Sequence, residues 1–220
     1  MHTKKKYLLD PNIALIREWQ TLANGAIKLL TFAPELNNSD QFINCLQTLN
    51  IIPAIGHSNA TFQEAEVAIK RGCKHITHLF NAMSGLHHRY PGVALSAFQH
   101  DILCELIADG HHVSWDMLNF VVQKKGCHEL CLVTDSMRAK CMPDGEYRLG
   151  EQKVYLKNSQ AKLEDGTLAG SVLRMQDAVK NLIQQNICTL KESIFLSSIN
   201  PAKQLGLFNK IGSIAIWKMG

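Results

Sequence analysis

One layout repeats along the 220-residue chain: a short apolar run ends in a residue that can bind a metal or move a proton, and a helical pattern follows. Buried parallel strands have continuous apolar sequences, and helices make the crossovers between them. The apolar runs end at Glu35, at His57, at His78, at His111 and His112, and at Asp135. In a (β/α) barrel the chemistry lies at the carboxyl ends of the strands. The layout therefore predicts an α/β barrel that carries a metal-assisted hydrolase site at one rim.

The composition argues against several other classes of protein. Hydrophobic residues make up 46% and charged residues 19% of the chain, as in an ordinary globular domain. The net charge of +4 owes much to the run 4–6 (KKK), which is short and has no aromatic-plus-basic motif beside it. No apolar run reaches the roughly 18 residues of a membrane span, and no secretory signal is visible. We therefore expect neither nucleic acid nor a membrane as a partner.

The cysteines indicate a reducing compartment. There are seven, an odd number, and no CxxC pair occurs. Cys127 and Cys131 lack the second pair that a zinc knuckle needs. We expect reduced thiols in a cytoplasmic protein.

Local signals predict the order of the elements. Strands are expected over 29–33, 51–56, 75–79, 102–108 and 130–134. Helix starts are expected at Asp10–Pro11, at Ser39, at the Thr61/Glu64 capping box, near residue 93, at Ser114, after 167–171, at the Thr189/Glu192 capping box and at Asn200–Pro201. Segment 141–168 is polar and punctuated by glycine, which predicts a hairpin insertion.

His57 and His78 form the strongest pair of candidate ligands. Each follows an apolar run, and they are 21 residues apart, about one βα unit. Two successive barrel strands would present both imidazoles to one point. Each histidine alone fits a structural role equally well, but their matched placement predicts metal ligation, for which neutral imidazole is well suited.

Three further residues allow two interpretations each. Asp135 ends the run LCLVTD, where a carboxylate is either a helix N-cap or a general acid/base next to a metal. His111 and His112 are consecutive, so at most one of them should face the site. Arg89 lies in the irregular loop 81–92, where it is either a solvated surface residue or a bidentate partner for an anionic substrate group.

Six motifs carry a resemblance to a known family. They are GHSNAT (56–61), THLFNAM (77–83), ADGHHV (108–113), LVTDS (132–136), GTLAGS (166–171) and NPAKQLGL (200–207). In sequence and in order they resemble the N-acetylglucosamine-6-phosphate deacetylases, a family of metal-bearing (β/α)8 barrels in the amidohydrolase superfamily. The resemblance runs from about Leu29 to Ser213.

The resemblance implies a role for each matching position. His57 and His78 would bind the divalent metal, commonly zinc, and Asp135 would be the catalytic acid/base. The implied substrate-binding residues are Asn81, Ala82, Arg89, His112, Leu168, Ala169 and Gly170. Among them Asn81 and Ala82 would line the sugar-phosphate site and Arg89 would contact the phosphate, while His111 fills a variable position.

The sequence also departs from the family pattern. The metal-binding glutamate of the family lies in an H-L-E-G-P motif, which does not occur in this sequence. Glu35 belongs to a later family motif and does not replace that ligand, and His2 is only a weak match to a histidine that follows the missing motif. We therefore expect an incomplete (β/α)8 barrel of about six strands over residues 1–213, and the start of a truncated β-sandwich strand at 214–220.

The expected activity is metal-dependent deacetylation of N-acetylglucosamine 6-phosphate to glucosamine 6-phosphate and acetate. Without the upstream glutamate, this chain alone is expected to be a poor enzyme or none. The alternatives are another amidohydrolase acting on a cyclic amide, and a catalytically inactive truncated remnant. The expected partners are an amino-sugar phosphate and further copies of the chain in a homo-oligomer.

Overall fold

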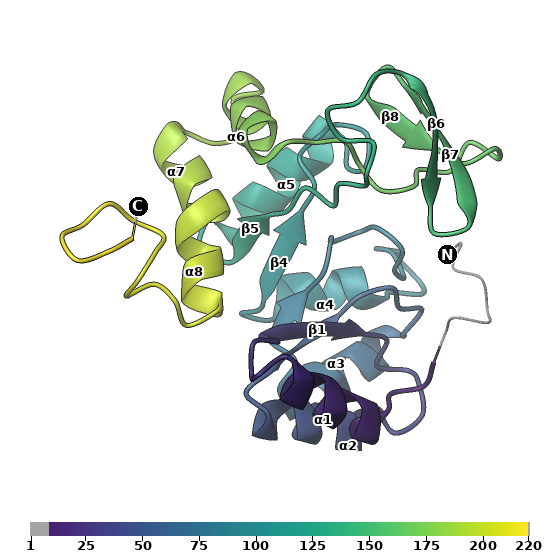
Figure 1. The fold of residues 1–220 in the computed structure, drawn as a ribbon, viewed down its shortest axis with the longest axis vertical. Coiled ribbons are helices and arrows are strands. Elements are labelled where there is room, and N and C mark those ends of the chain that lie inside the picture. The colour runs from purple at the N-terminus through teal and green to yellow at the C-terminus, as the bar shows by residue number, and fades with distance from the viewer. Residues whose placement is uncertain (1–8, 220) are drawn as a thin grey trace. The chain divides into compact units, whose positions relative to one another are not determined.

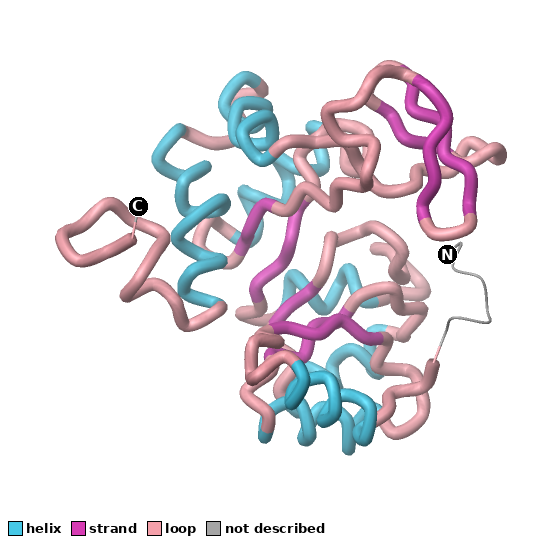
Figure 2. Tube along the Cα trace, in the orientation of Figure 1, coloured by secondary structure: helices cyan, strands magenta, loops and turns pink. Residues whose placement is uncertain are grey.

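A computed structural model provides the fold and describes residues 9–219. The chain divides into two compact units, residues 1–105 and 106–220, and the boundary falls within strand β4 (Leu103–Leu106). Figures 1 and 2 show the elements of both units. No described helix is long and apolar enough to cross a membrane.

The first unit alternates helices with parallel strands. In chain order its further elements are α1 (Ile13–Leu22), β1 (Leu29–Phe32), α2 (Ser39–Thr48), β2 (Ile52–Ile55), α3 (Phe62–Arg71), β3 (His75–Ile76) and α4 (Val93–Gln99). Strands β1 to β4 pair in sequence order, each parallel to the next. Ile43 and Leu46 of α2 and Ile55 and Ile76 of the strands are fully buried. This alternation confirms the predicted βα layout.

The second unit contains strand β5, a separate antiparallel sheet and four helical segments after it. Its elements are α5 (Trp115–Lys125), β5 (Leu130–Leu132), β6 (Gly145–Leu149), β7 (Gln152–Lys157), β8 (Gln160–Lys162), α6 (Met175–Gln184), α7 (Leu190–Ile194), a π-helical segment (Phe195–Ile199) and α8 (Asn200–Gln204). Strand β5 follows β4 in the sheet order, and the Val133 amide donates to the Leu106 carbonyl at 3.0 Å. The described residues thus form five strands of the incomplete barrel, where about six were expected.

The predicted insertion is present as a small antiparallel sheet. Strand β7 pairs with β6 on one side and with β8 on the other. Val154 and Leu156 alternate with exposed residues along β7 and face a small core of their own. A third strand therefore completes the predicted hairpin.

Capping chemistry explains where several helices begin. The Thr61 hydroxyl accepts from the Glu64 amide at 3.3 Å, and the Glu64 carboxylate accepts from the Thr61 amide at 2.7 Å, as predicted. The N-cap of α1 is Asn12 and not Asp10, because the Asn12 side chain accepts from the Leu15 amide at 3.0 Å. The predicted break before Asn200 is also wrong, since the π-helical segment joins α7 to α8 without interruption.

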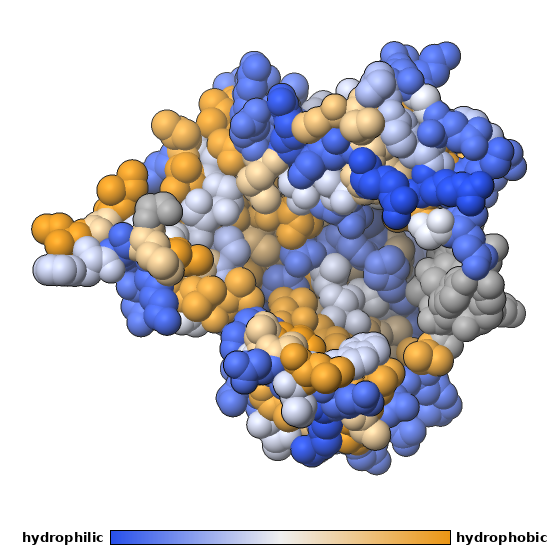
Figure 3. Space-filling view, viewed as in Figure 1, coloured by the Kyte–Doolittle hydropathy of each residue, from blue (hydrophilic) through white to orange (hydrophobic). Residues whose placement is uncertain are grey.

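The C-terminal segment differs from the expected strand. Residues 214–219 contain a turn at 216–217 and no strand. Lys218 holds the segment by donating to the Ser213 hydroxyl at 2.7 Å and lying 3.7 Å from the Phe208 ring centre. Ile214 and Trp217 are almost fully exposed, and Figure 3 shows apolar side chains at the tip of this loop. A lone strand has no partner for its backbone groups, which explains why the apolar pattern alone does not form one.

Candidate metal and substrate site

The register between β2 and β3 brings His57 and His78 together. Ala54 lies opposite His75 and Ile55 opposite Ile76, so each residue of β2 has its partner 21 positions later. His57 and His78 have the same separation and follow the two strands. Their Nε2 atoms lie 2.9 Å apart, and the ring planes meet at 80°. The two imidazoles therefore meet at one point, and their role as metal ligands stays a prediction.

A glycine allows the strand ends to approach closely beneath this pair. The hydroxyls of Thr31, in β1, and of Thr77, directly after β3, are hydrogen-bonded at 2.8 Å. A Cβ atom at Gly56 would lie 2.7 Å from the Thr31 methyl group and 2.8 Å from the Thr77 Cβ. Any side chain at position 56 would therefore push the neighbouring strands apart just below His57.

Several of the predicted site residues have a left-handed backbone. The φ angles are 50° at His57, 32° at His78, 48° at Ala82 and 47° at Asp135. Such conformations cost a non-glycine residue about 1–3 kcal/mol and persist only where the surroundings enforce them. Strained backbone conformations cluster at functional sites. Here they occur after the strands at whose ends the sequence predicts site residues.

Hydrogen bonds to Glu105 and Asn81 hold the backbone of His78 in place. Its side chain is buried, its amide donates to the Glu105 carboxylate at 3.0 Å, and its carbonyl accepts from the Asn81 amide at 2.9 Å. The Nδ1 atom is buried and has no hydrogen-bond partner in the described part of the chain. A ligating histidine usually donates from its second nitrogen to an acceptor, so this atom departs from the usual arrangement.

The pair fits two positions of a zinc site. Two imidazoles on one tetrahedral zinc, with bonds of about 2.0–2.1 Å, place their nitrogens roughly 3.3 Å apart. The observed distance of 2.9 Å between the two Nε2 atoms would need to increase only slightly for both to bind one zinc ion. No group of three histidine, cysteine, aspartate or glutamate side chains within residues 9–219 is arranged to hold a metal. The described residues therefore provide two ligands and not a complete set.

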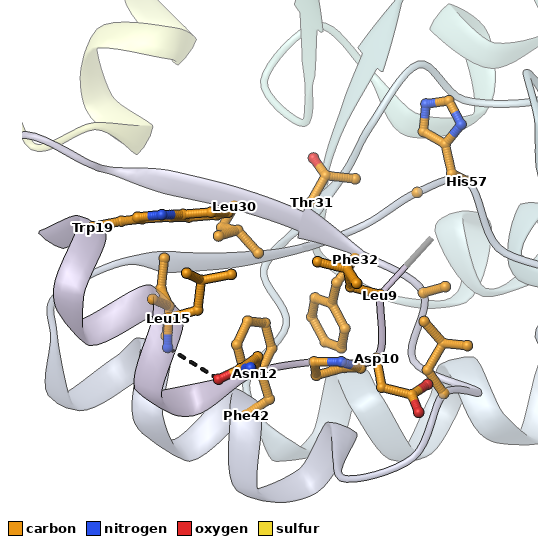
Figure 4. A pocket seen from close by; sticks show the side chains of 15 residues that line it. Leu9, Asp10, Asn12, Leu15, Trp19, Leu30, Thr31, Phe32, Phe42 and His57 are labelled. Carbon is orange, nitrogen blue, oxygen red and sulfur yellow. Dashed lines mark hydrogen bonds between the residues drawn. The ribbon is translucent and has the colours of Figure 1, made fainter. Parts of the chain in front are cut away.

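An apolar cavity borders His57 on the side of α1. Its volume is about 540 Å³, and Figure 4 shows Trp19, Leu30, Phe32 and Phe42 in its wall. Most of the lining side chains are apolar, and the polar ones are those of Asp10, Asn12, Thr31 and His57. No sequence pattern predicts this cavity. It forms between separate segments of the chain, and within each segment the apolar residues look like ordinary core residues.

The loop after β3 carries Asn81, Ala82 and Arg89. Ala82 and Arg89 are exposed, whereas Asn81 donates from its side chain to the carbonyls of the turn at His78. The His87 ring accepts from the amides of Arg89 and Tyr90, each at 3.2 Å. This loop is thus locally ordered at the position where the sequence predicts a substrate loop.

In the second unit the structure brings Asp135 next to the loop 168–170. The Ser171 amide donates to the Asp135 carbonyl at 2.8 Å, and Gly170, at a φ of 68°, lies so close that a Cβ atom would be 3.3 Å from that carbonyl. The Asp135 side chain is exposed and caps no helix, since residues 136–139 are not helical. The N-cap alternative for Asp135 is therefore wrong.

The two adjacent histidines of this unit have different surroundings. His112 bonds through Nδ1 to the Asp109 carboxylate at 2.7 Å, whereas His111 is exposed and meets the Gln160 side chain at 3.0 Å. They lie in a bend and not in a strand. Burial opposes ionisation of Asp109, but the hydrogen bonds from His112 outweigh it and the pKa of Asp109 lies below its ordinary value. His112 is therefore the oriented histidine of the two.

The sequence reasoning missed Glu105 and Asp109. Both carboxylates contact predicted site residues, Glu105 through the His78 amide and Asp109 through the His112 ring. The sequence does contain a signal for both, because each is a charged residue in the otherwise apolar run ILCELIAD. A buried carboxylate needs a partner, and in each case that partner is a candidate site residue.

Comparison with known proteins agrees with this geometry. The chain is 40% identical to an N-acetylglucosamine-6-phosphate deacetylase of Bacillus subtilis, over 97% of this chain and 54% of the relative. It is 42% identical to the corresponding Lysinibacillus sphaericus enzyme, over 93% and 53%. The chain thus spans about half the length of the curated relatives it matches.

Solved structures give the same result. A Pasteurella multocida N-acetylglucosamine-6-phosphate deacetylase superposes with a TM-score of 0.92 at 30% identity, over 99% of this chain and 57% of the other. A Thermotoga maritima enzyme of the same name superposes with a TM-score of 0.89 at 38% identity, over 96% and 57%. Residues 12–219 match the family described as the Amidohydrolase family. With its incomplete (β/α) barrel and its paired strand-end histidines, this chain belongs to the amidohydrolase family.

Proposed function

We propose that this chain is the part of an amino-sugar-phosphate deacetylase that carries two metal ligands, the acid/base and most of the substrate contacts. The reaction is hydrolysis of the N-acetyl amide of N-acetylglucosamine 6-phosphate to acetate and glucosamine 6-phosphate. The 2.9 Å approach of the His57 and His78 Nε2 atoms is the observation that carries the proposal. The names of the relatives support this substrate.

His57 and His78 hold the divalent metal, for which zinc is the proposed identity. Members of this family generally depend on a divalent metal. Such a cation supplies Lewis acidity toward an amide carbonyl and lowers the pKa of water. Because catalytic zinc normally takes three protein ligands, the proposal includes a third ligand, a carboxylate, from outside the described residues.

Asp135 serves as the acid/base. Its side chain is exposed, so it can exchange protons with water and substrate, and its carbonyl accepts a hydrogen bond from the Ser171 amide. As a carboxylate it takes the proton of the attacking water, and as the acid it returns that proton to the departing amine. The loop 168–170, which lies beside it, contacts the substrate.

The phosphate and sugar are bound by Arg89, His112, Asn81 and Ala82. Arg89 offers a bidentate guanidinium on an exposed loop. We also propose, from the sequence, that the protein is cytoplasmic and that it assembles into a homo-oligomer.

Removing either histidine should remove the metal. We expect His57→Ala and His78→Ala each to lose nearly all zinc after equilibration and dialysis, because one imidazole cannot hold the ion. Elemental analysis measures the zinc content, and His111→Ala, an exposed histidine outside the pair, is the control. Full zinc occupancy in both variants, or no uptake by the wild-type chain, contradicts the metal site.

Asp135→Asn should remove proton transfer without removing binding. In the chain supplied with an upstream H-L-E-G-P segment from a relative, we expect turnover to fall about 10²–10⁴-fold. Zinc content and affinity for the substrate should stay as in the parent. Asp101→Asn, which changes an exposed carboxylate, is the control. Turnover within a fewfold of the parent would rule out Asp135 as the acid/base.

Arg89→Ala should weaken binding of the phosphorylated sugar selectively. Loss of a bidentate contact to phosphate is expected to lower affinity for N-acetylglucosamine 6-phosphate at least about tenfold, as for a charged hydrogen bond. Affinity for N-acetylglucosamine itself should change little in calorimetric titrations. Arg71→Ala, which removes a surface arginine paired with Asp40, is the control. Equal losses for both sugars would assign Arg89 a structural role.

A further inference from the structure

Two carboxylates flank the histidine pair without belonging to it. Glu35 follows β1, the outer neighbour of β2, and Glu105 lies in β4, the outer neighbour of β3. Since His57 follows β2 and His78 follows β3, each histidine has one of these carboxylates on the adjoining strand, on the side away from the other histidine.

Glu35 holds the two residues that come directly after His57. One carboxylate oxygen accepts from the Ser58 hydroxyl at 2.7 Å, and the other accepts from the Asn59 amide at 2.6 Å. The Ser58 hydroxyl in turn accepts from the Ala60 amide at 3.0 Å, and Ser58 is fully buried. The register explains the contact, because Phe32 lies opposite Ile55 and the same offset places Glu35 opposite Ser58.

Glu105 holds His78 itself. One oxygen accepts from the His78 amide at 3.0 Å, and the other lies 2.9 Å from the His75 Nε2 atom. The side chains of His75 and Glu105 are only 3% and 15% exposed. A single carboxylate therefore connects the buried strand β3 to the turn where the predicted ligand lies.

The backbone at both histidines needs such support. Their φ angles of 50° and 32° lie in the left-handed region, which is uncommon for residues other than glycine, although asparagine, aspartate and histidine adopt it more often than the rest. Strained conformations persist where surrounding contacts over-determine them. We infer that Glu35 and Glu105 are positioning residues, which clamp the left-handed turns at His57 and His78 so that the two Nε2 atoms converge on one point.

A carboxylate suits this role better than an amide. It presents two acceptor oxygens and no donor. Three of the four partners are hydroxyl or amide donors, and the fourth is the His75 ring. The inference deepens the proposed function and rests on it, since the clamp is proposed to position the two metal ligands. The clamp itself, however, can be measured without any metal.

The test uses the 220-residue chain and the variants Glu35→Ala, Glu35→Gln, Glu105→Leu and Glu105→Gln. Amide hydrogen exchange by NMR reports the freed donors, and a cross-relaxation signal between the His57 and His78 ring protons reports their approach. The ring centres lie 4.6 Å apart in the intact chain. Zinc affinity from competition with a chelator is the third readout, and Glu146→Ala, an exposed carboxylate paired with Lys153, is the control.

We expect Glu35→Ala to speed exchange of the Asn59 amide and Glu105→Leu that of the His78 amide, each at least about tenfold by local opening and without affecting the other. Both variants should lose the ring-to-ring signal and bind zinc at least about tenfold more weakly. The glutamine variants, which keep one acceptor, should lie between them and the wild type.

Uniformly faster exchange across the chain would overturn the inference, because it would assign the carboxylates a general structural role. A ring-to-ring signal that persists after the amides are freed would overturn it as well. A wild-type chain that shows the signal but binds no zinc would contradict the proposed metal site and leave the clamp to be decided by the first two readouts.

Discussion

The parallel register between β2 and β3 is the constraint on which the candidate site depends. It offsets paired residues by 21 positions, so His57 and His78 leave their strands at the same level. A slip of one residue would direct one imidazole to the opposite face of the sheet. Gly56 permits this arrangement because the hydrogen-bonded side chains of Thr31 and Thr77 occupy the space where a side chain at position 56 would lie.

The predictable part of the site is the part that depends on local pattern. Continuous apolar runs predict all five strands, and the 21-residue spacing predicts the histidine pair. The capping boxes at Thr61 and Thr189 were equally visible, since their partners lie three residues away. In each case a short sequence contains both members of the interaction.

The rest depends on contacts between distant segments. Glu105 meets the His78 amide 27 positions earlier, and nothing near either residue indicates the bond. Strand β3 spans only His75–Ile76, because the chain enters the left-handed turn at His78 sooner than its apolar pattern suggests. The apolar segment 214–219 forms no strand, since a strand requires a partner that the pattern does not contain.

The central claim is that His57 and His78 together bind a divalent metal. X-ray absorption at the zinc edge of the zinc-loaded chain measures the ligands directly. The account predicts two imidazole nitrogens at about 2.0–2.1 Å, with the multiple-scattering signature of histidine, and oxygen ligands at the remaining positions. A first shell without histidine scattering, or with the scattering unchanged when both histidines are replaced, would contradict it.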